Sequence, residues 1–97
     1  MSTEKVKEVV INSLKPEAAP EQAFQVIGEI LVGFDGFESV TRSQDISDPL
    51  TFMDEVTWRD SEAALSAQSA IEKHPQFPEF AGLFQETKFF SHFKSLN

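Results

Sequence analysis

The stretch that decides the fold runs from residue 51 to residue 71 and reads TFMDEVTWRDSEAALSAQSAI. Side chains at positions 51–58 alternate with the period of two that is typical of a β-strand, although Asp54 interrupts the apolar side. Asp60 or Ser61 can then cap a helix, whose stripe of small apolar residues predicts close packing against a neighbour. The stretch therefore predicts a strand that leads directly into a helix.

The segments on either side of this stretch predict the remaining strands and the other helix. Residues 5–14 are rich in Val and Ile and predict a strand, and a helix should begin near Pro20 and end at Gly33 to Gly36. Residues 37–44 predict the next strand, turn-forming residues at 45–49 predict a hairpin loop, and residues 87–94 predict the last strand. The order β-α-β-β-α-β predicts an α+β, ferredoxin-like fold in a single domain covering residues 1–97.

Composition limits the classes of function. The formal net charge of −8 creates a field that repels phosphate backbones and anionic membranes, so we expect neither nucleic acid nor a membrane as a partner. The absence of cysteine excludes a disulfide framework, a thiolate nucleophile and a thiolate zinc site, and it fits a cytoplasmic location. No apolar run has the length of a signal peptide or a membrane span. Ten Phe residues without any Tyr provide apolar bulk but no phenol.

The predicted fold leaves one face of the sheet uncovered. A four-stranded antiparallel sheet in the strand order 4-1-3-2, with both helices on one face, exposes apolar side chains on the other face. A second copy of the chain can cover that face, so we expect a homodimer that forms a dimeric α+β barrel. A space between the sheets or beneath the helices, lined by Phe, Met and Val, would suit a small hydrophobic or aromatic ligand.

Two stretches carry a resemblance to a known family. They read FMDEVTWRDSEAA, at residues 52–64, and HPQFPEF, at residues 74–80. Both resemble the antibiotic biosynthesis monooxygenase-like superfamily of dimeric α+β barrels, in particular small, poorly characterised members whose last strand ends in a His-Phe pair, here His92 and Phe93. The likeness covers nearly the whole chain and specifies the fold better than the activity.

The resemblance implies a homodimer and, in some members, oxidation of quinols or polyketide phenols without a cofactor or metal, in which the bound substrate activates oxygen. Many members carry a His about ten residues after the strand-three Trp, where this chain has Gln68. Members that cleave haem use an Asn, a Trp and a His together. This chain has those types at Asn12, Trp58 and His74, but Ala67 occupies the place of the catalytic Trp, so we do not expect haem cleavage.

The candidate catalytic residues are His92 and Glu55. In the order 4-1-3-2 the last and third strands flank the first, so His92 and an acidic group of strand three can lie across Val10 from each other. Alternation favours Glu55 as the partner of His92 in the dimer space and places Asp54 beneath the helices. Imidazole titrates near neutral pH, which suits a proton carrier, although a hydrogen-bonded structural histidine is the competing interpretation.

Five further residues are candidates for binding a ligand. They are Trp58, Asn12, Arg42, Phe90 and His74. Three of them also have a structural interpretation: Trp58 can be a core anchor, His74 can satisfy helix-terminal carbonyls before Pro75, and Arg42 can form a salt bridge with either acidic residue of strand three. We expect no metal site.

Three functions remain open. The first is a cofactor-free monooxygenase for a small aromatic or quinol substrate. The second is a non-catalytic module that binds a hydrophobic molecule, and the third is a structural or regulatory dimer without a ligand. A void beneath the helices, lined by His92, Glu55 or Trp58, favours the first two functions, whereas continuous packing favours the third.

Overall fold

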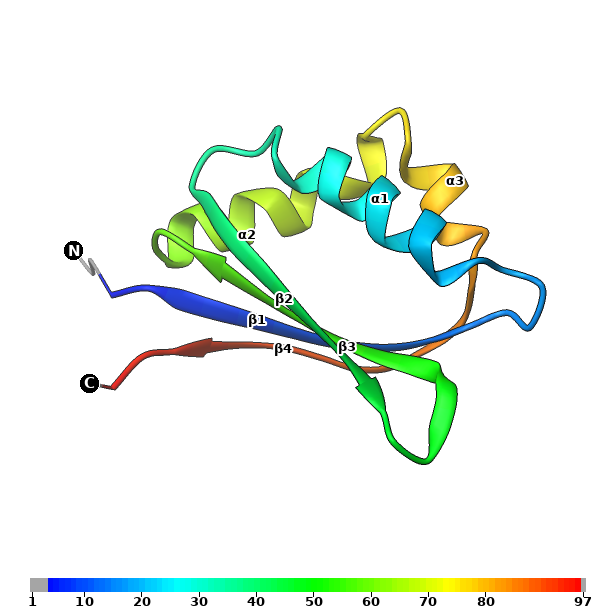
Figure 1. Ribbon diagram of the computed structural model, residues 1–97. Helices are drawn as coiled ribbons and strands as arrows, with labels where there is room; N and C mark the ends of the chain where they lie inside the picture. The colour runs from blue at the N-terminus through cyan, green and yellow to red at the C-terminus, as the bar shows by residue number, and fades with distance from the viewer. Residues whose placement is uncertain (1–3, 97) are drawn as a thin grey trace.

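The computed structural model describes residues 4–96 as a sheet covered on one face by helices (Figure 1). The strands are β1 (Val6–Leu14), β2 (Phe37–Asp45), β3 (Asp48–Trp58) and β4 (Phe84–Lys94). The helices are α1 (Pro20–Leu31), α2 (Ser61–Ala70), the short 3-10 helix η1 (Ile71–Lys73) and α3 (Phe77–Ala81). The sheet order is β2-β3-β1-β4 and every pairing is antiparallel, so the predicted ferredoxin-like subunit fold is confirmed.

Local sequence signals determine where the two main helices begin. Pro20 occupies the first turn of α1, where its missing N–H costs no hydrogen bond. Asp60 caps α2, because its Oδ1 accepts a hydrogen bond of 2.9 Å from the N–H of Ala63. Both predicted helix starts are therefore confirmed.

Three boundaries differ from the expectation. Residues 77–81 form the additional short helix α3, since Pro78 lies in its first turn and is tolerated there. Strand β3 begins at Asp48, which shortens the hairpin loop, and β4 begins at Phe84 instead of residue 87. The earlier start of β4 includes two register shifts against β1, between Ile11 and Asn12 and between Ser13 and Leu14.

The core lies between the sheet and the helices. Trp58, Leu14 and Ile30 are its largest fully buried side chains. Helix α1 contributes a buried stripe, and α2 packs closely through small residues, as its sequence predicted. The cluster holds the end of β3 rigidly against the helical layer, and this is the end that carries Trp58.

Candidate functional site

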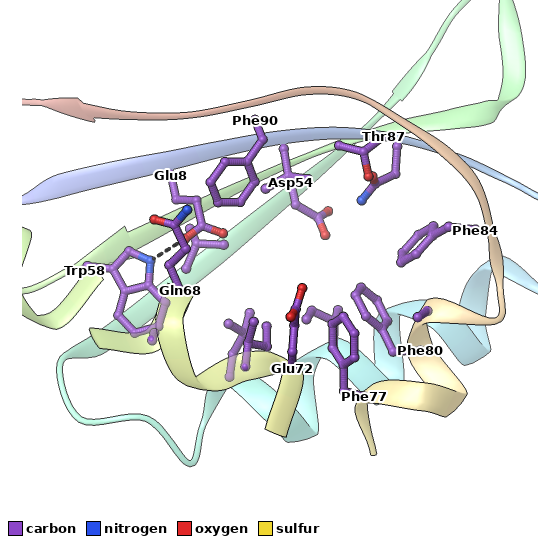
Figure 2. A pocket seen from close by; sticks show the side chains of 18 residues that line it. Glu8, Asp54, Trp58, Gln68, Glu72, Phe77, Phe80, Phe84, Thr87 and Phe90 are labelled. Carbon is purple, nitrogen blue, oxygen red and sulfur yellow. Dashed lines mark hydrogen bonds between the residues drawn. The ribbon is translucent and has the colours of Figure 1, made fainter. Parts of the chain in front are cut away.

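A cavity of about 440 Å³ lies between the sheet and the helical layer. Aromatic side chains form much of its wall, namely Trp58, Phe77, Phe80, Phe84 and Phe90. The polar groups that reach it are Asn12 and, as Figure 2 shows, Glu8, Asp54, Gln68, Glu72 and Thr87. An apolar, aromatic wall with a few polar groups is typical of a site for a small molecule.

Strand register places the sheet side of this cavity. Val10 pairs with Asp54 on one neighbouring strand and with Phe90 on the other, so all three lie in one row facing the helices. Two residues along β1, and so on the same face, Glu8 pairs with His92 and with Val56 in the same way. The period of two then brings Trp58 to the same face at the end of β3.

Glu8 joins Trp58 and His92 in one hydrogen-bonded network. The indole Nε1–H of Trp58 donates to Glu8 Oε1 at 3.2 Å, and His92 Nε2 lies 3.2 Å from the same oxygen. Only 1% of Trp58 is exposed, and Phe34 and Phe37 contact its ring edge to face. The network fixes the indole at the cavity wall, because the ring can no longer rotate without losing its hydrogen bond.

Asp54 is a largely buried carboxyl group of the cavity. Its side chain is 17% exposed, and Arg42 Nε lies 3.6 Å from its Oδ1, a distance too long for a hydrogen bond. Within residues 4–96, Asp54 Oδ1 and Arg42 Nε have no hydrogen-bond partner. Burial raises the pKa of Asp54 to about 6, although Arg42 opposes this rise, and the charge of Glu8 adds to it.

Arg42 is held behind Asp54 and does not line the cavity. Its Nη2 donates a hydrogen bond of 3.1 Å to the carbonyl of Phe24, and its guanidinium lies 4.9 Å from the centre of the Phe24 ring. The expected salt bridge between Arg42 and an acidic residue of strand three is therefore present, with Asp54. Arg42 tunes a group of the cavity without contacting the cavity itself.

The predicted pairing of His92 with Glu55 is wrong. Glu55 pairs with Val9, one position out of step with the row of Glu8 and His92, and therefore lies on the opposite face of the sheet. There it forms an ion pair of 3.6 Å with Lys7. The residues across Val10 are Asp54 and Phe90. The error arose because alternation defines two faces of β4 but, with Phe on both, does not say which one meets the helices.

The five predicted ligand-binding residues separate into two groups. Trp58, Asn12 and Phe90 line the cavity, and Asn12 Oδ1 accepts a hydrogen bond of 2.6 Å from the hydroxyl of Thr87. His74 does not line it. Its Nδ1 accepts a hydrogen bond of 3.1 Å from the N–H of Gln76, so it organises the chain between η1 and α3.

Sequence reasoning missed Glu8 and Glu72. Glu8 stands in a period of two with Val6 and Val10, so an acidic residue on an apolar strand face was a signal that could have been used. Glu72 lies in η1, beyond the predicted helix stripe, and had no comparable signal. Asp54 was expected beneath the helices, which is confirmed, but it was not expected as a site residue.

Residues 4–96 contain neither a cluster of metal ligands nor a helix suited to a membrane. No three side chains among His, Asp and Glu gather there in a way that could hold a metal ion. No helix in this part of the chain combines the length and apolar character required to cross a membrane.

Fold and cavity together define a ferredoxin-like α+β subunit whose candidate site lies between one sheet and its own helices. Several solved structures share this subunit fold. SnoaB, a cofactor-independent oxygenase from Streptomyces nogalater, has a TM-score of 0.71 at 16% identity, over 97% of this chain and 95% of that chain. A candidate antibiotic biosynthesis monooxygenase from Chloroflexus aurantiacus has a TM-score of 0.72 at 13% identity, over 96% and 94%.

A candidate antibiotic biosynthesis monooxygenase from Bordetella bronchiseptica has a TM-score of 0.68 at 16% identity, over 97% of this chain and 99% of that chain. No family model matches the sequence, and no curated protein matches it. The resemblance to antibiotic biosynthesis monooxygenases is thus confirmed in the fold. At these identities the likeness describes the fold alone.

Proposed function

We propose that the protein is a cofactor-free monooxygenase that oxidises a small phenol or quinol in the cavity beneath its helices. The observation that carries the proposal is Asp54, whose largely buried carboxyl group lines an aromatic cavity (Figure 2). A general base works best when its pKa lies near the working pH, and burial moves the pKa of Asp54 toward that range. The fold likeness to SnoaB supports the same class of reaction.

The proposed chemistry needs only the substrate and molecular oxygen. The Asp54 carboxylate accepts the phenol proton, and the resulting phenolate donates electrons to oxygen. A ring carbon that lies ortho or para to the phenolic oxygen and carries a hydrogen forms a bond to one oxygen atom and loses that hydrogen. The O–O bond breaks, and the second oxygen leaves as water with two hydrogens of the substrate. For α-naphthol, the products are the para-naphthoquinone and one water, so atoms and electrons balance.

Glu8 and His92 act in this proposal as positioning residues. They hold the indole of Trp58 at the cavity wall through the shared Oε1 atom of Glu8. A fixed aromatic surface orients a flat substrate so that its hydroxyl group faces Asp54. The proposal thus gives the buried carboxylate of strand three, Asp54, the proton-transfer role that sequence reasoning assigned to His92 and Glu55.

Oxygen uptake with α-naphthol in metal-free buffer tests the proposal. We expect consumption of oxygen with one labelled atom appearing in the quinone when labelled molecular oxygen is used. Asp54→Asn should reduce turnover by about 100-fold or more, because it removes the base. Glu55→Gln, next to it in sequence but on the opposite sheet face, should retain turnover. Loss of activity in Glu55→Gln alone, at unchanged oligomeric state, would contradict the assignment.

The non-catalytic binding module is the second candidate. The observation that favours it is that the lining residues within 4–96 include no His, Lys or Arg to assist a reaction. If α-naphthol binds to the cavity but no oxygen is consumed, this second function replaces the first. The cavity, lined by Trp58, weighs against a purely structural dimer, which would require continuous packing.

We also propose that two copies pair through the uncovered face of the sheet. Phe89 and Phe93 stack on that face with ring centres 6.2 Å apart, and 41% and 48% of these side chains are exposed. They belong to the last strand, next to β1, whose Val9 and Ile11 lie on the same face. Stacked, exposed aromatic rings on a sheet face are typical of an interface, and a second copy offers the complementary surface.

A further inference from the structure

The cavity contains charges of one sign only. Glu8, Asp54 and Glu72 line it, whereas no Lys, Arg or His of the described residues does so. Glu8 and Asp54 influence each other electrostatically, because the charge of Glu8 is one cause of the raised pKa of Asp54. A hollow lined by one sign of charge, in a chain of net charge −8, concentrates the opposite charge inside it.

The nearest basic side chains lie behind these carboxylates and not in the cavity. Arg42 lies beside Asp54 and donates a hydrogen bond to the carbonyl of Phe24. His92 contacts Oε1 of Glu8, the same oxygen that accepts the hydrogen bond from Trp58. Neither of the two reaches the cavity wall. An anionic ligand would therefore meet three carboxylates without a compensating donor of positive charge.

Glu72 differs from the other two carboxylates in its position. It lies in η1 on the helical wall, is exposed, and extends into the cavity toward the strand that carries Asp54 (Figure 2). Within residues 4–96, its side chain takes part in no hydrogen bond or ion pair. A carboxylate that remains hydrated at the edge of an aromatic site can pair with a cation at little desolvation cost.

We infer that the cavity selects substrates by charge and takes a phenol that carries an ammonium group, with Glu72 as the partner of that group. The aromatic walls hold the ring, and the walls also favour a cation through their π faces. Asp54 remains free to face the phenol. This inference rests on the proposed function, because it treats the cavity as the substrate site.

Three matched probes test this selection. They share one phenol ring and differ in side-chain charge: tyramine carries an ammonium group, para-ethylphenol is neutral, and para-hydroxyphenylpropionate carries a carboxylate. Binding to the intact protein is measured by calorimetry without oxygen, at neutral pH and low salt. Trp58, the only Trp of the chain, reports binding at the cavity through its fluorescence.

We expect tyramine to bind about tenfold more tightly than para-ethylphenol and the carboxylate probe about tenfold more weakly. The spread should shrink as salt is added. Glu72→Gln should reduce the preference for tyramine over para-ethylphenol by about threefold or more. The matched control is Glu62→Gln, which removes the same charge from the exposed first turn of α2, away from the cavity, and should leave the preference unchanged.

Equal binding of the three probes, the reverse order, or no binding of any probe would overturn the inference. Equal effects of Glu72→Gln and Glu62→Gln would also overturn it, because the net charge of the chain would then explain the preference. The outcome is separable from that of the proposed function. If the probes bind in the order of their charge but α-naphthol causes no oxygen uptake, the oxygenase proposal alone is refuted. If α-naphthol is turned over but the probes do not bind in the order of their charge, the charge selection alone is refuted.

Discussion

At the scale of single residues, Asp54 is the group on which the proposed chemistry depends. Its neighbours on β3, Met53 and Glu55, point away from the helices, so alternation alone delivers one carboxyl group to the interior. Burial disfavours the charged form of Asp54 more than the charge of Arg42 favours it. The pKa of Asp54 is therefore raised to about 6. A carboxyl group whose pKa is raised in this way lowers the folding stability near neutral pH.

The pH dependence of folding should reveal this cost. A carboxyl pKa raised from 3.8 to about 6 stabilises the folded state fully below pH 3.8, and this stabilisation is lost as the pH rises through about 6. Two pKa units correspond to about 3 kcal/mol of unfolding free energy. Urea unfolding should be measured across this pH range for both proteins. As the pH rises, the free energy of unfolding should fall by about 3 kcal/mol less in Asp54→Asn than in the native chain. Parallel pH profiles of the two proteins would refute this assignment.

At the scale of elements, the loop from α1 to β2 locks the helical layer onto the sheet. Gly36 has a φ of 88°, which L side chains rarely adopt, and its carbonyl accepts a hydrogen bond of 2.7 Å from the N–H of Arg59. A Cβ atom at this position would lie 2.4 Å from the Cβ of Ala63 in α2. The end of β3, including Trp58, is thus positioned where a loop, a strand and a helix meet without space for a methyl group.

Gly36→Ala should lower the free energy of unfolding by about 2–4 kcal/mol, since it adds both backbone strain and a clash with α2. Chemical denaturation measures the change. Gly33→Ala, in the same loop, is the control: its added Cβ would lie 3.6 Å from the nearest atom, the carbonyl oxygen of Ile30, an ordinary contact. If both substitutions cost the same, the close packing of the loop on α2 is not what requires glycine.

At the scale of the whole molecule, the two faces of the sheet carry different side chains and have different surroundings. The helices cover one face of the sheet (Figure 1), where the core and the cavity lie, and the opposite face carries the exposed Phe89 and Phe93. The register shifts in β4 contribute to this division, because each inserts a residue and changes which side chains point to which face. A partner chain on the open face would leave the cavity accessible, since it lies on the other side of the sheet.

The proposed dimer predicts a simple change of mass. Phe93→Asp places a charge in the middle of the proposed contact and should convert a dimer into a monomer in sedimentation experiments. Leu65→Asp is the matched control: Leu65 is also an exposed apolar residue, but it belongs to α2 in the helical layer, so its substitution should leave the dimer intact. A native chain that stays monomeric at high concentration would exclude the proposed pairing.

Local pattern was sufficient to predict the elements and their order. The alternation of residues 51–58, the cap at Asp60 and the placement of Pro20 each depend on neighbours within a few positions, and those neighbours are visible in the sequence. The helix α3 was missed because a short helix has almost no periodicity of its own and forms mainly by packing its Phe side chains over the cavity.

The sequence by itself determined the fold, the presence of Trp58, Asn12 and Phe90 at the candidate site, and the burial of Asp54. Only the tertiary structure decided that Glu8 joins Trp58 to His92, that Glu55 lies on the other face, and that Glu72 reaches the cavity. The physical reason is that periodicity gives each strand two faces without saying which one meets the helices. That choice depends on register and bulges between segments distant in the chain, and one residue of slip reverses it.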